Sequence, residues 1–328
     1  MQREPIDALE RAALSGDWAA AARLGLRYLT GTDVPADPMR GIALIDQAAR
    51  SGDAEGAYLA ATIASTSFWR PYNWQGALDH LLHAAELGHE AAGAALKILA
   101  AGPEGGSLAT GDRRAMREAV DLDAWFAPPE PRLLREAPRI HVLEHFVPPA
   151  VCEWLITQSR AGLSRATIYD KATGGTTEDG RRTNSQCDLD VAVGGVLTFV
   201  IRARISAITG RQDAAMEVPK VLHYRPGETF AEHYDYLNPD EPAYARELEV
   251  RGQRTDTFLI YLNDDFSGGA TNFPELDIAH VGATGDALLF SNVDAEGKPD
   301  ERTRHAGLPP TTGEKWLFSQ WIREFPRN

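Results

Sequence analysis

Small and apolar residues recur every 36 positions through the first third of the chain. Sliding the sequence by that distance superposes an Ala-Ala pair, a glycine and a large apolar residue on their counterparts. The aligned segments are 12–17, 48–53 and 84–89, and the apolar residues are Leu9, Ile45 and Leu81. Small side chains let helices approach closely and glycine ends a helix at low cost, so the pattern predicts stacked helical pairs over residues 5–100. A generic alanine-rich helical bundle is the alternative interpretation.

The hydrophobic periodicity changes after a proline-rich stretch. Pro128, Pro129 and Pro131 cannot continue a helix and favour an extended spacer, which places a linker at residues 126–138. Helical spacing returns at 149–160 and 193–208. Further on, short β-rich runs alternate with turn residues, and the expected strands are 218–224, 257–263, 286–292 and 315–322.

These patterns predict an α+β chain with two domains. Residues 1–125 are expected to form the helical repeat, a solenoid. Residues 139–328 are expected to form an antiparallel jelly-roll barrel, or double-stranded β-helix, with supporting helices. A length of 328 residues is sufficient for two such domains.

Composition narrows the class of protein. A formal charge of −14 disfavours nucleic acid as a partner. No run reaches the ~18 apolar residues that cross a bilayer, and the first residues lack the apolar core of a signal peptide, so we expect a cytoplasmic protein without a membrane partner. Cys152 and Cys187 are the only cysteines, which excludes a four-cysteine zinc site and leaves histidine and carboxylate as metal ligands.

Histidine and carboxylate side chains with metal-ligand spacing occur in the second half of the chain. His233 and Asp235 are two positions apart, so a strand would point both to one face, and His305 follows 70 residues after Asp235. Two imidazoles and one carboxylate on one face of an octahedral Fe(II) leave three positions open, for a bidentate 2-oxo acid and dioxygen. Lys315 lies ten residues beyond His305, where a hairpin would set it on the neighbouring strand. A buried ammonium there needs an anion.

The residues around these positions resemble the prolyl 4-hydroxylase family. Segment 224–236 is similar to that family's Tyr-x-x-Gly-x-x-Tyr-x-x-His-x-Asp-Tyr element, and segment 182–185 to its Arg-Thr-Ser-Ser. The other segments that match in order are 261–274, 285–290, 305–307 and 313–321. The helical repeats in turn resemble Sel1-like repeats, which are related to the tetratricopeptide solenoid.

The resemblance implies an Fe(II)- and 2-oxoglutarate-dependent dioxygenase. The catalytic iron ligands would be His233, Asp235 and His305. Lys315 would bind the far carboxylate of 2-oxoglutarate, while Tyr224 and Thr271 would either contact this co-substrate or pack as ordinary strand residues. Dioxygen would be the second co-substrate, ascorbate a further requirement, and succinate and CO2 the co-products.

Arg182, Phe230 and Trp321 are the candidate residues on the substrate side. Arg182 is either a surface charge or part of the substrate entrance, and Trp321 is also compatible with the core. Phe230 replaces a tyrosine of the family and Ala270 replaces a glutamate, which leaves the substrate open. Residues 238–253, rich in Pro, Glu and Tyr, are a candidate lid.

Three functions remain open at this point. The first is a peptidyl-proline hydroxylase whose repeats dock a protein or peptide substrate, which a large groove between repeats and barrel would favour. The second is a hydroxylase of a free amino acid or other small metabolite, with the repeats as an assembly module; a small closed pocket with a second carboxylate-binding arginine would favour it. The third is a non-catalytic scaffold, against which the intact triad and Lys315 argue.

Overall fold

The computed structural model describes residues 4–107, 111–170 and 175–326. Contacts between residues divide the chain into two units. Unit 1 comprises Met1–Phe126 and Val191–Ala203, and unit 2 comprises Ala127–Asp190 and Arg204–Asn328. All candidate site residues lie in unit 2.

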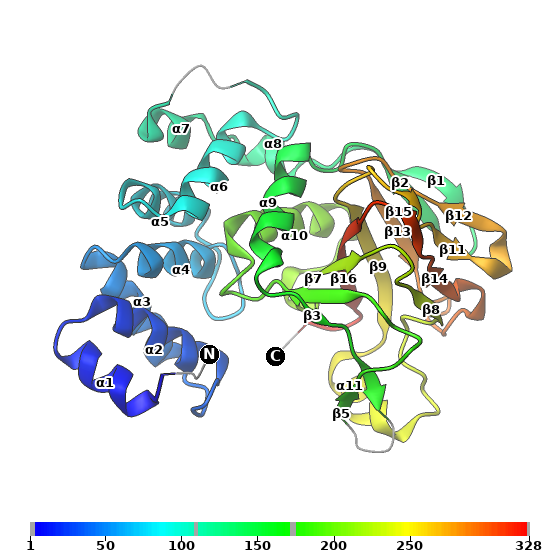
Figure 1. Ribbon diagram of the computed structural model, residues 1–328, viewed down its shortest axis with the longest axis horizontal. Helices are drawn as coiled ribbons and strands as arrows, with labels where there is room; N and C mark the ends of the chain where they lie inside the picture. Colours follow the sequence, from blue (N-terminus) through cyan, green and yellow to red (C-terminus); the bar gives the residue numbers. More distant parts are fainter. Residues whose placement is uncertain (1–3, 108–110, 171–174, 327–328) are drawn as a thin grey trace. The chain divides into compact units, whose positions relative to one another are not determined.

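Unit 1 is built from short helices joined by tight turns. Its helices are α1 (Ile6–Leu14), α2 (Trp18–Thr30), α3 (Pro38–Arg50), α4 (Ala54–Ala64), α5 (Trp74–Glu86), α6 (Glu90–Ala101), α7 (Arg113–Ala119) and α8 (Leu122–Phe126). Consecutive helices from α1 to α6 lie side by side, as the blue to cyan ribbons of Figure 1 show. Their buried residues are largely alanine and leucine, which allows close packing.

The 36-residue spacing reappears in the turns between helices. Three glycines adopt positive φ, which glycine tolerates without steric cost, and these are Gly16, Gly52 and Gly88, with φ of 91°, 86° and 92°. The next residue caps the following helix in each case: Asp17 and Asp53 through a carboxylate, His89 through Nδ1. The predicted helical pairs are therefore confirmed, and the turn and cap account for the period.

Two antiparallel sheets form the body of unit 2 in the described residues. The eight-stranded sheet has the order β1-β2-β13-β9-β16-β7-β6-β3. Its strands are β1 (Arg132–Arg135), β2 (Ile140–Leu143), β3 (Ser164–Arg165), β6 (Ser185–Asp188), β7 (Lys220–Tyr224), β9 (Arg254–Tyr261), β13 (Ala287–Ser291) and β16 (Lys315–Arg323). The four-stranded sheet, in the order β12-β11-β14-β8, consists of β8 (Phe230–His233), β11 (Thr271–Phe273), β12 (Ile278–His280) and β14 (His305–Gly307).

Smaller elements complete the described part of the chain. Two short strand pairs are β4 (Ile168–Asp170) with β5 (Gly175–Thr177), and β10 (Ser267–Gly268) with β15 (Pro310–Thr312). The remaining helices are α9 (Pro149–Arg160), α10 (Gly195–Thr209) and α11 (Ala245–Arg251). The 3-10 turns are η1 (Asp213–Ala215), η2 (Pro242–Tyr244), η3 (Pro274–Leu276) and η4 (Glu301–Thr303).

The predicted α+β fold with a jelly-roll barrel is confirmed. The four expected strands correspond to β7, β9, β13 and β16, all in the eight-stranded sheet, and the expected helices correspond to α9 and α10. The proline-rich segment 126–138 holds β1, which pairs with β2. Strands of the four-stranded sheet have only three or four residues each, too few to show a clear alternation in sequence.

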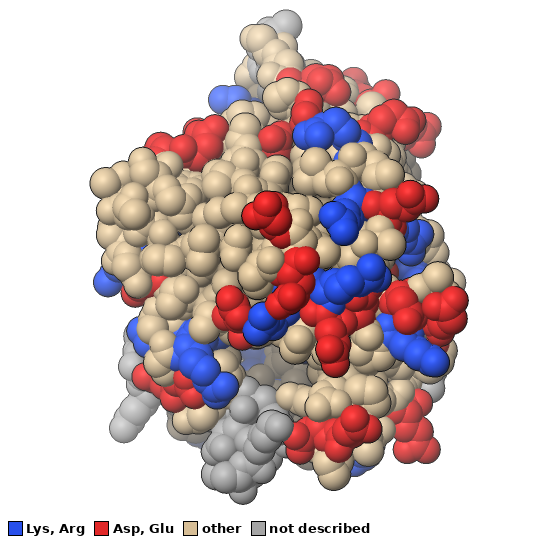
Figure 2. Space-filling view, turned by 90° about the vertical axis from the view of Figure 1, so that its right-hand side faces the viewer, with Lys and Arg blue, Asp and Glu red and all other residues tan. Residues whose placement is uncertain are grey.

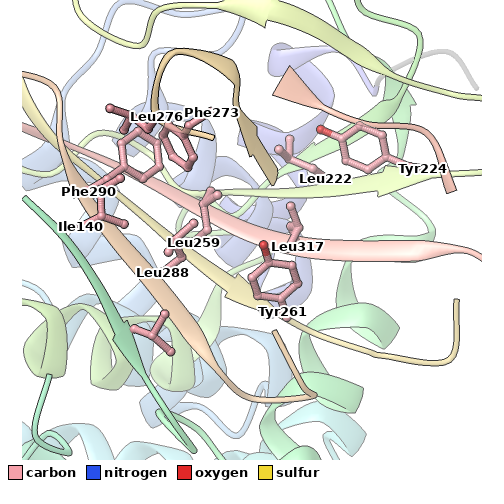
Figure 3. Close-up of a cluster of buried hydrophobic side chains, with 11 residues drawn as sticks. Ile140, Leu222, Tyr224, Leu259, Tyr261, Phe273, Leu276, Leu288, Phe290 and Leu317 are labelled. Atoms are coloured by element: carbon pink, nitrogen blue, oxygen red, sulfur yellow. The ribbon is translucent and has the colours of Figure 1, made fainter. Parts of the chain in front are cut away.

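Apolar side chains from both sheets meet in one core, shown in Figure 3. Phe273 of β11 packs edge to face on Phe290 of β13, with ring centroids 5.1 Å apart. Leu259 and Tyr261 of β9 belong to the same cluster. The ring of His305 lies 4.9 Å from that of Phe290, so this candidate ligand rests directly on the core.

The surface carries mixed charge. Figure 2 shows lysine and arginine interspersed with aspartate and glutamate on the face that lies to the right in Figure 1. Arg304, for example, pairs with Glu232 at 3.0 Å and also contacts Glu275. Within the described residues, every helix is too short or too polar to traverse a lipid bilayer.

The crossing of α2 and α3 generates the first prediction. A Cβ on Gly41 would lie 2.6 Å from the carbonyl oxygen of Gly25, whereas a Cβ on Gly93 meets nothing within 4 Å. Both glycines are the fourth residue of their helices. We expect Gly41→Ala to lower the free energy of unfolding by about 1–3 kcal/mol, because the helices must separate. Gly93→Ala should raise it by about 0.5–1 kcal/mol. Urea denaturation measures both, and equal effects would contradict the packing described.

Candidate active site

Two candidate ligands face each other across a strand pair. β8 ends at His233, β14 begins at His305, and the register of the pair sets these two residues opposite each other. Cross-strand neighbours hold their Cβ atoms about 4.5–5.5 Å apart. The centroids of the two imidazole rings are 4.3 Å apart. The pairing thus unites residues that are distant in sequence.

Asp235 lies in a bend after the end of β8. The prediction that His233 and Asp235 share one strand is therefore wrong. The backbone leaves the sheet because its hydrogen bonds go elsewhere: the Asp235 carbonyl accepts from Arg254 Nη1 at 3.3 Å, and Leu237 N–H donates to the Gln253 side chain at 2.6 Å. The bend nevertheless brings the carboxylate to both imidazoles.

The three side chains present converging ligand atoms. Asp235 Oδ1 lies 3.6 Å from His233 Nε2, and Oδ2 lies 3.5 Å from His305 Nε2. The Nδ1 atoms lie 2.8 Å and 3.0 Å from the carbonyl oxygens of Ala231 and Thr303. Since a carbonyl only accepts, each Nδ1 carries the proton and each Nε2 offers a lone pair. The ligand atoms all lie within 4.8 Å of one another, and this donor set fits Fe(II).

Electrostatics favour the protonation states that bind a metal. Burial lowers the pKa of His305 to about 4, and nearby His233 acts in the same direction. Burial by itself raises the pKa of Asp235, but His305, His233 and a hydrogen bond from Thr257 outweigh it and hold the pKa below its usual range. The site therefore combines neutral imidazole with ionised carboxylate, as metal coordination requires.

Lys315 is fully buried, with 0% of its surface exposed. Its Nζ donates to the carbonyl oxygen of Gly269 at 2.6 Å, and no acidic side chain of the described residues forms an ion pair with it. Burial lowers the pKa of Lys315 to about 7. A buried amine of this kind is suited to an anionic ligand that restores its charge.

The predicted hairpin between His305 and Lys315 is wrong. β14 belongs to the four-stranded sheet and β16 to the eight-stranded sheet, where Lys315 pairs with Tyr224 of β7. β15, between them, pairs instead with β10, because proline residues and a glycine turn carry the chain across the barrel. Lys315 consequently lies in the opposite sheet from the histidines, on the same face of β16 as Leu317 and Ser319, which line the inner cavity with the triad.

Aromatic and hydroxyl groups surround the lysine. The ring centroids of Tyr224 and Tyr261 lie 5.2 Å and 5.8 Å from Lys315 Nζ. The Tyr261 hydroxyl lies 2.9 Å from Thr271 Oγ1. Burial raises the pKa of Tyr224 to about 12, so its phenol stays protonated. Tyr224 and Thr271 both line the inner cavity together with the triad.

An outer cleft of about 480 Å³ opens beside the triad. Arg182, Phe230 and Trp321 line both this cleft and the inner cavity. Arg182 is only 6% exposed, so its interpretation as a surface charge is wrong. Its guanidinium lies 4.3 Å from the centroid of Phe230, whose ring stacks on His233 at 3.5 Å. Tyr244, within the candidate lid, lines the cleft as well.

Several residues of the cleft were not singled out from the sequence. Arg254 packs over Trp321 at 3.8 Å and pairs with both carboxylate oxygens of Glu217, at 2.7 Å and 3.0 Å. Lys220 lines the cleft and pairs with Asp188. Arg254 and Lys220 each begin a strand, and a charged residue at the start of a β-rich run was the signal available in the sequence. Charged residues on the solvent face of a strand give the same signal, so it does not identify a cleft residue.

Comparison with known proteins places this geometry in a family. Residues 219–323 match the model of the 2OG-Fe(II) oxygenase superfamily. The chain is 33% identical to prolyl 4-hydroxylase subunit alpha-1 of Rattus norvegicus over 189 residues, which cover 58% of this chain and 35% of that protein. It is 33% identical to prolyl 4-hydroxylase 1 of Arabidopsis thaliana over 217 residues, which cover 60% of this chain and 72% of that protein.

The solved structure of a Sel1 repeat protein from Oxalobacter formigenes covers 35% of this chain and 47% of that one, with 27% identity and a TM-score of 0.28. The chain spans about a third of the length of the rat relative. The identity with the plant enzyme over most of its length, together with the superfamily match, shows that this chain belongs to the prolyl 4-hydroxylase family of 2-oxoglutarate- and iron-dependent dioxygenases.

Proposed function

We propose that this protein hydroxylates a proline C–H bond within a peptide, with Fe(II), dioxygen and 2-oxoglutarate. The observations that carry the proposal are the triad, whose ligand atoms converge within 4.8 Å, and the buried Lys315 of the opposite sheet, which lacks an acidic partner in the described chain. The relatives named prolyl 4-hydroxylase support the choice of proline.

The triad would hold the metal. Bound iron supplies the activation of dioxygen, by which 2-oxoglutarate becomes succinate and CO2 and one oxygen atom enters the substrate C–H bond. His233 and His305 would coordinate through Nε2, since their Nδ1 protons are directed to backbone carbonyls. Dependence on ascorbate is part of the same proposal.

The residues across the barrel would bind the co-substrate. Lys315 would pair with its far carboxylate, and Tyr224 and Thr271 would donate hydrogen bonds or close the cavity around it. All three side chains are at least 98% buried, so water is excluded from the ligand. Orientation of the 2-oxo acid toward the triad follows from anchoring its opposite end.

The outer cleft supports a peptide substrate. It is open and wide enough for a chain segment, and its aromatic residues Phe230, Tyr244 and Trp321 suit a proline ring. Arg182 lines the cleft, and its guanidinium is suited to donate to a peptide carbonyl. We further propose that the helical repeats contribute to docking a protein substrate.

One observation favours a second candidate function. Arg182 forms no ion pair with any described residue and lies where the cleft meets the inner cavity. A guanidinium so placed is also suited to the carboxylate of a free amino acid. Peptides and free L-proline therefore both belong in the test.

Succinate formation tests the proposal. We expect the anaerobically iron-loaded protein to form succinate from 2-oxoglutarate on exposure to oxygen, with stimulation of tenfold or more by a proline-rich peptide pool. His233→Ala should abolish turnover because a ligand is lost, while His80→Ala, which alters a histidine of unit 1, should retain it. Stimulation by free L-proline alone would support the second candidate. No turnover despite bound iron under all these conditions would contradict the proposed activity.

The titration of Lys315 gives a prediction about pH. Burial lowers its pKa to about 7 in the free protein, and a bound carboxylate raises it, so binding takes up a proton above pH 7. The affinity for 2-oxoglutarate should therefore fall as pH rises from 7 to 9, by about tenfold per unit at the steepest.

Calorimetry in two buffers of different ionisation enthalpy measures this proton uptake. Lys315→Met should bind 2-oxoglutarate at least a hundredfold more weakly and show no proton uptake from this group. Wild-type affinity that stays constant from pH 7 to 9 would contradict the assignment of Lys315.

A further inference from the structure

A buried hydroxyl fixes the carboxylate of the triad. Thr257 of β9 is 1% exposed, and its Oγ1 donates to Asp235 Oδ2 at 2.7 Å. β9 lies in the eight-stranded sheet, whereas the two histidines belong to the four-stranded sheet. The hydrogen bond therefore links Asp235, in a bend outside any strand, to a rigid element on the other side of the barrel.

The direction of this hydrogen bond is determined by its partners. Asn292, which is 0% exposed, lies with Nδ2 2.9 Å from Thr257 Oγ1. An ionised carboxylate only accepts, so the single hydroxyl proton of Thr257 goes to Asp235. The hydroxyl then has only lone pairs left for Asn292, which must present its amino group. Asn292, Thr257 and Asp235 thus form a relay in which every donor points the same way.

Asn292 is also connected to His305. Its backbone carbonyl oxygen accepts from Asp300 N–H at 3.1 Å, and the Asp300 carbonyl accepts from Thr303 Oγ1 at 2.6 Å. The Thr303 carbonyl in turn accepts from His305 Nδ1 at 3.0 Å. The side chain of Asn292 therefore acts on the carboxylate through Thr257, whereas the chain to the imidazole starts from its backbone.

We propose that Thr257 and Asn292 are positioning residues that hold the Asp235 carboxylate in place for the metal. The inference rests on the proposed function, because it concerns the same iron site. The bond from Thr257 takes up Oδ2 and prevents rotation of the carboxylate, so that Asp235 meets the metal in one fixed orientation. Groups that orient ligands in this way typically change metal affinity by 10–100-fold when they are removed.

Substitution of Thr257 separates positioning from packing. Thr257→Val keeps the shape and removes the hydroxyl, and we expect it to weaken binding of Co(II), used as an air-stable probe of the site, by 10–100-fold. Thr257→Ser restores the hydroxyl and should bind within about threefold of wild type. Thr255→Val is the matched control: Thr255 is 8% exposed on the same strand, but its hydroxyl lies near the Ile322 carbonyl at 3.4 Å, away from the triad. It should leave Co(II) affinity unchanged.

Asn292 provides a second, independent test. Asn292→Ala should weaken Co(II) binding by a similar factor, and the double variant with Thr257→Val should bind no more weakly than the worse single variant, because the residues act as one unit. Melting temperatures of the metal-free variants check that each is folded. If Thr257→Val is unfolded, the comparison of Asn292→Ala with wild type decides the question.

The outcomes distinguish this inference from the proposed function. A wild-type protein that binds no Co(II) at the triad would overturn the proposed function. A wild type that binds Co(II), with folded Thr257→Val and Asn292→Ala variants of equal affinity, would overturn the relay alone. Loss of affinity in Thr257→Ser as large as in Thr257→Val would also overturn it, because shape rather than the hydroxyl would then matter.

Discussion

The pairing of β8 with β14 is the interaction on which the site depends. It sets His233 opposite His305, and no other feature of the sequence requires these two residues to meet. β14 pairs on its other side with β11, which carries Thr271, so one four-stranded sheet positions both imidazoles and a wall of the inner cavity. A slip of one residue in this register would turn one imidazole to the opposite face of the sheet.

The opposite sheet supplies further polar groups of the site. Lys315, Tyr224 and Thr257 come from β16, β7 and β9, which lie next to one another in the eight-stranded sheet. Burying the Lys315 amine without an acidic partner is unfavourable for the free protein, which its lowered pKa reflects. Because the buried amine gains a partner when an anion binds, the same burial makes the position selective for an anion. The free protein is less stable for carrying this residue, and the residue serves binding instead.

Much of the fold and the chemistry could be predicted from the sequence. The period of 36 residues has a local cause, a positive-φ glycine followed by a helix cap, and local causes are visible in sequence. The triad and Lys315 were recognised because the segments around them resemble, in order, those of the prolyl 4-hydroxylase family. The bend at Asp235 was not predicted, since it depends on hydrogen bonds to Arg254 and Gln253, which are distant in sequence.

Other parts of the site were not predictable for the same physical reason. Thr257 in β9 and Asn292, directly after β13, are ordinary buried residues, and only their contacts distinguish them. From the sequence, Arg182 is either a surface residue or part of the substrate entrance. In the structure it packs on Phe230, with which it forms an isolated β-bridge, and this contact helps to bury it. Tertiary contacts between sheets therefore carry the information that the sequence pattern lacks.

The central claim is that the triad and Lys315 form one site that binds the two ends of a single co-substrate. Calorimetric titration of 2-oxoglutarate and glutarate, with and without Fe(II) under nitrogen, tests it most directly. Both acids offer a carboxylate to Lys315, but only 2-oxoglutarate has a 2-oxo acid to chelate the metal. We expect Fe(II) to strengthen 2-oxoglutarate binding by tenfold or more and to leave glutarate binding unaffected. An equal effect of Fe(II) on both acids, or no effect on either, would contradict it.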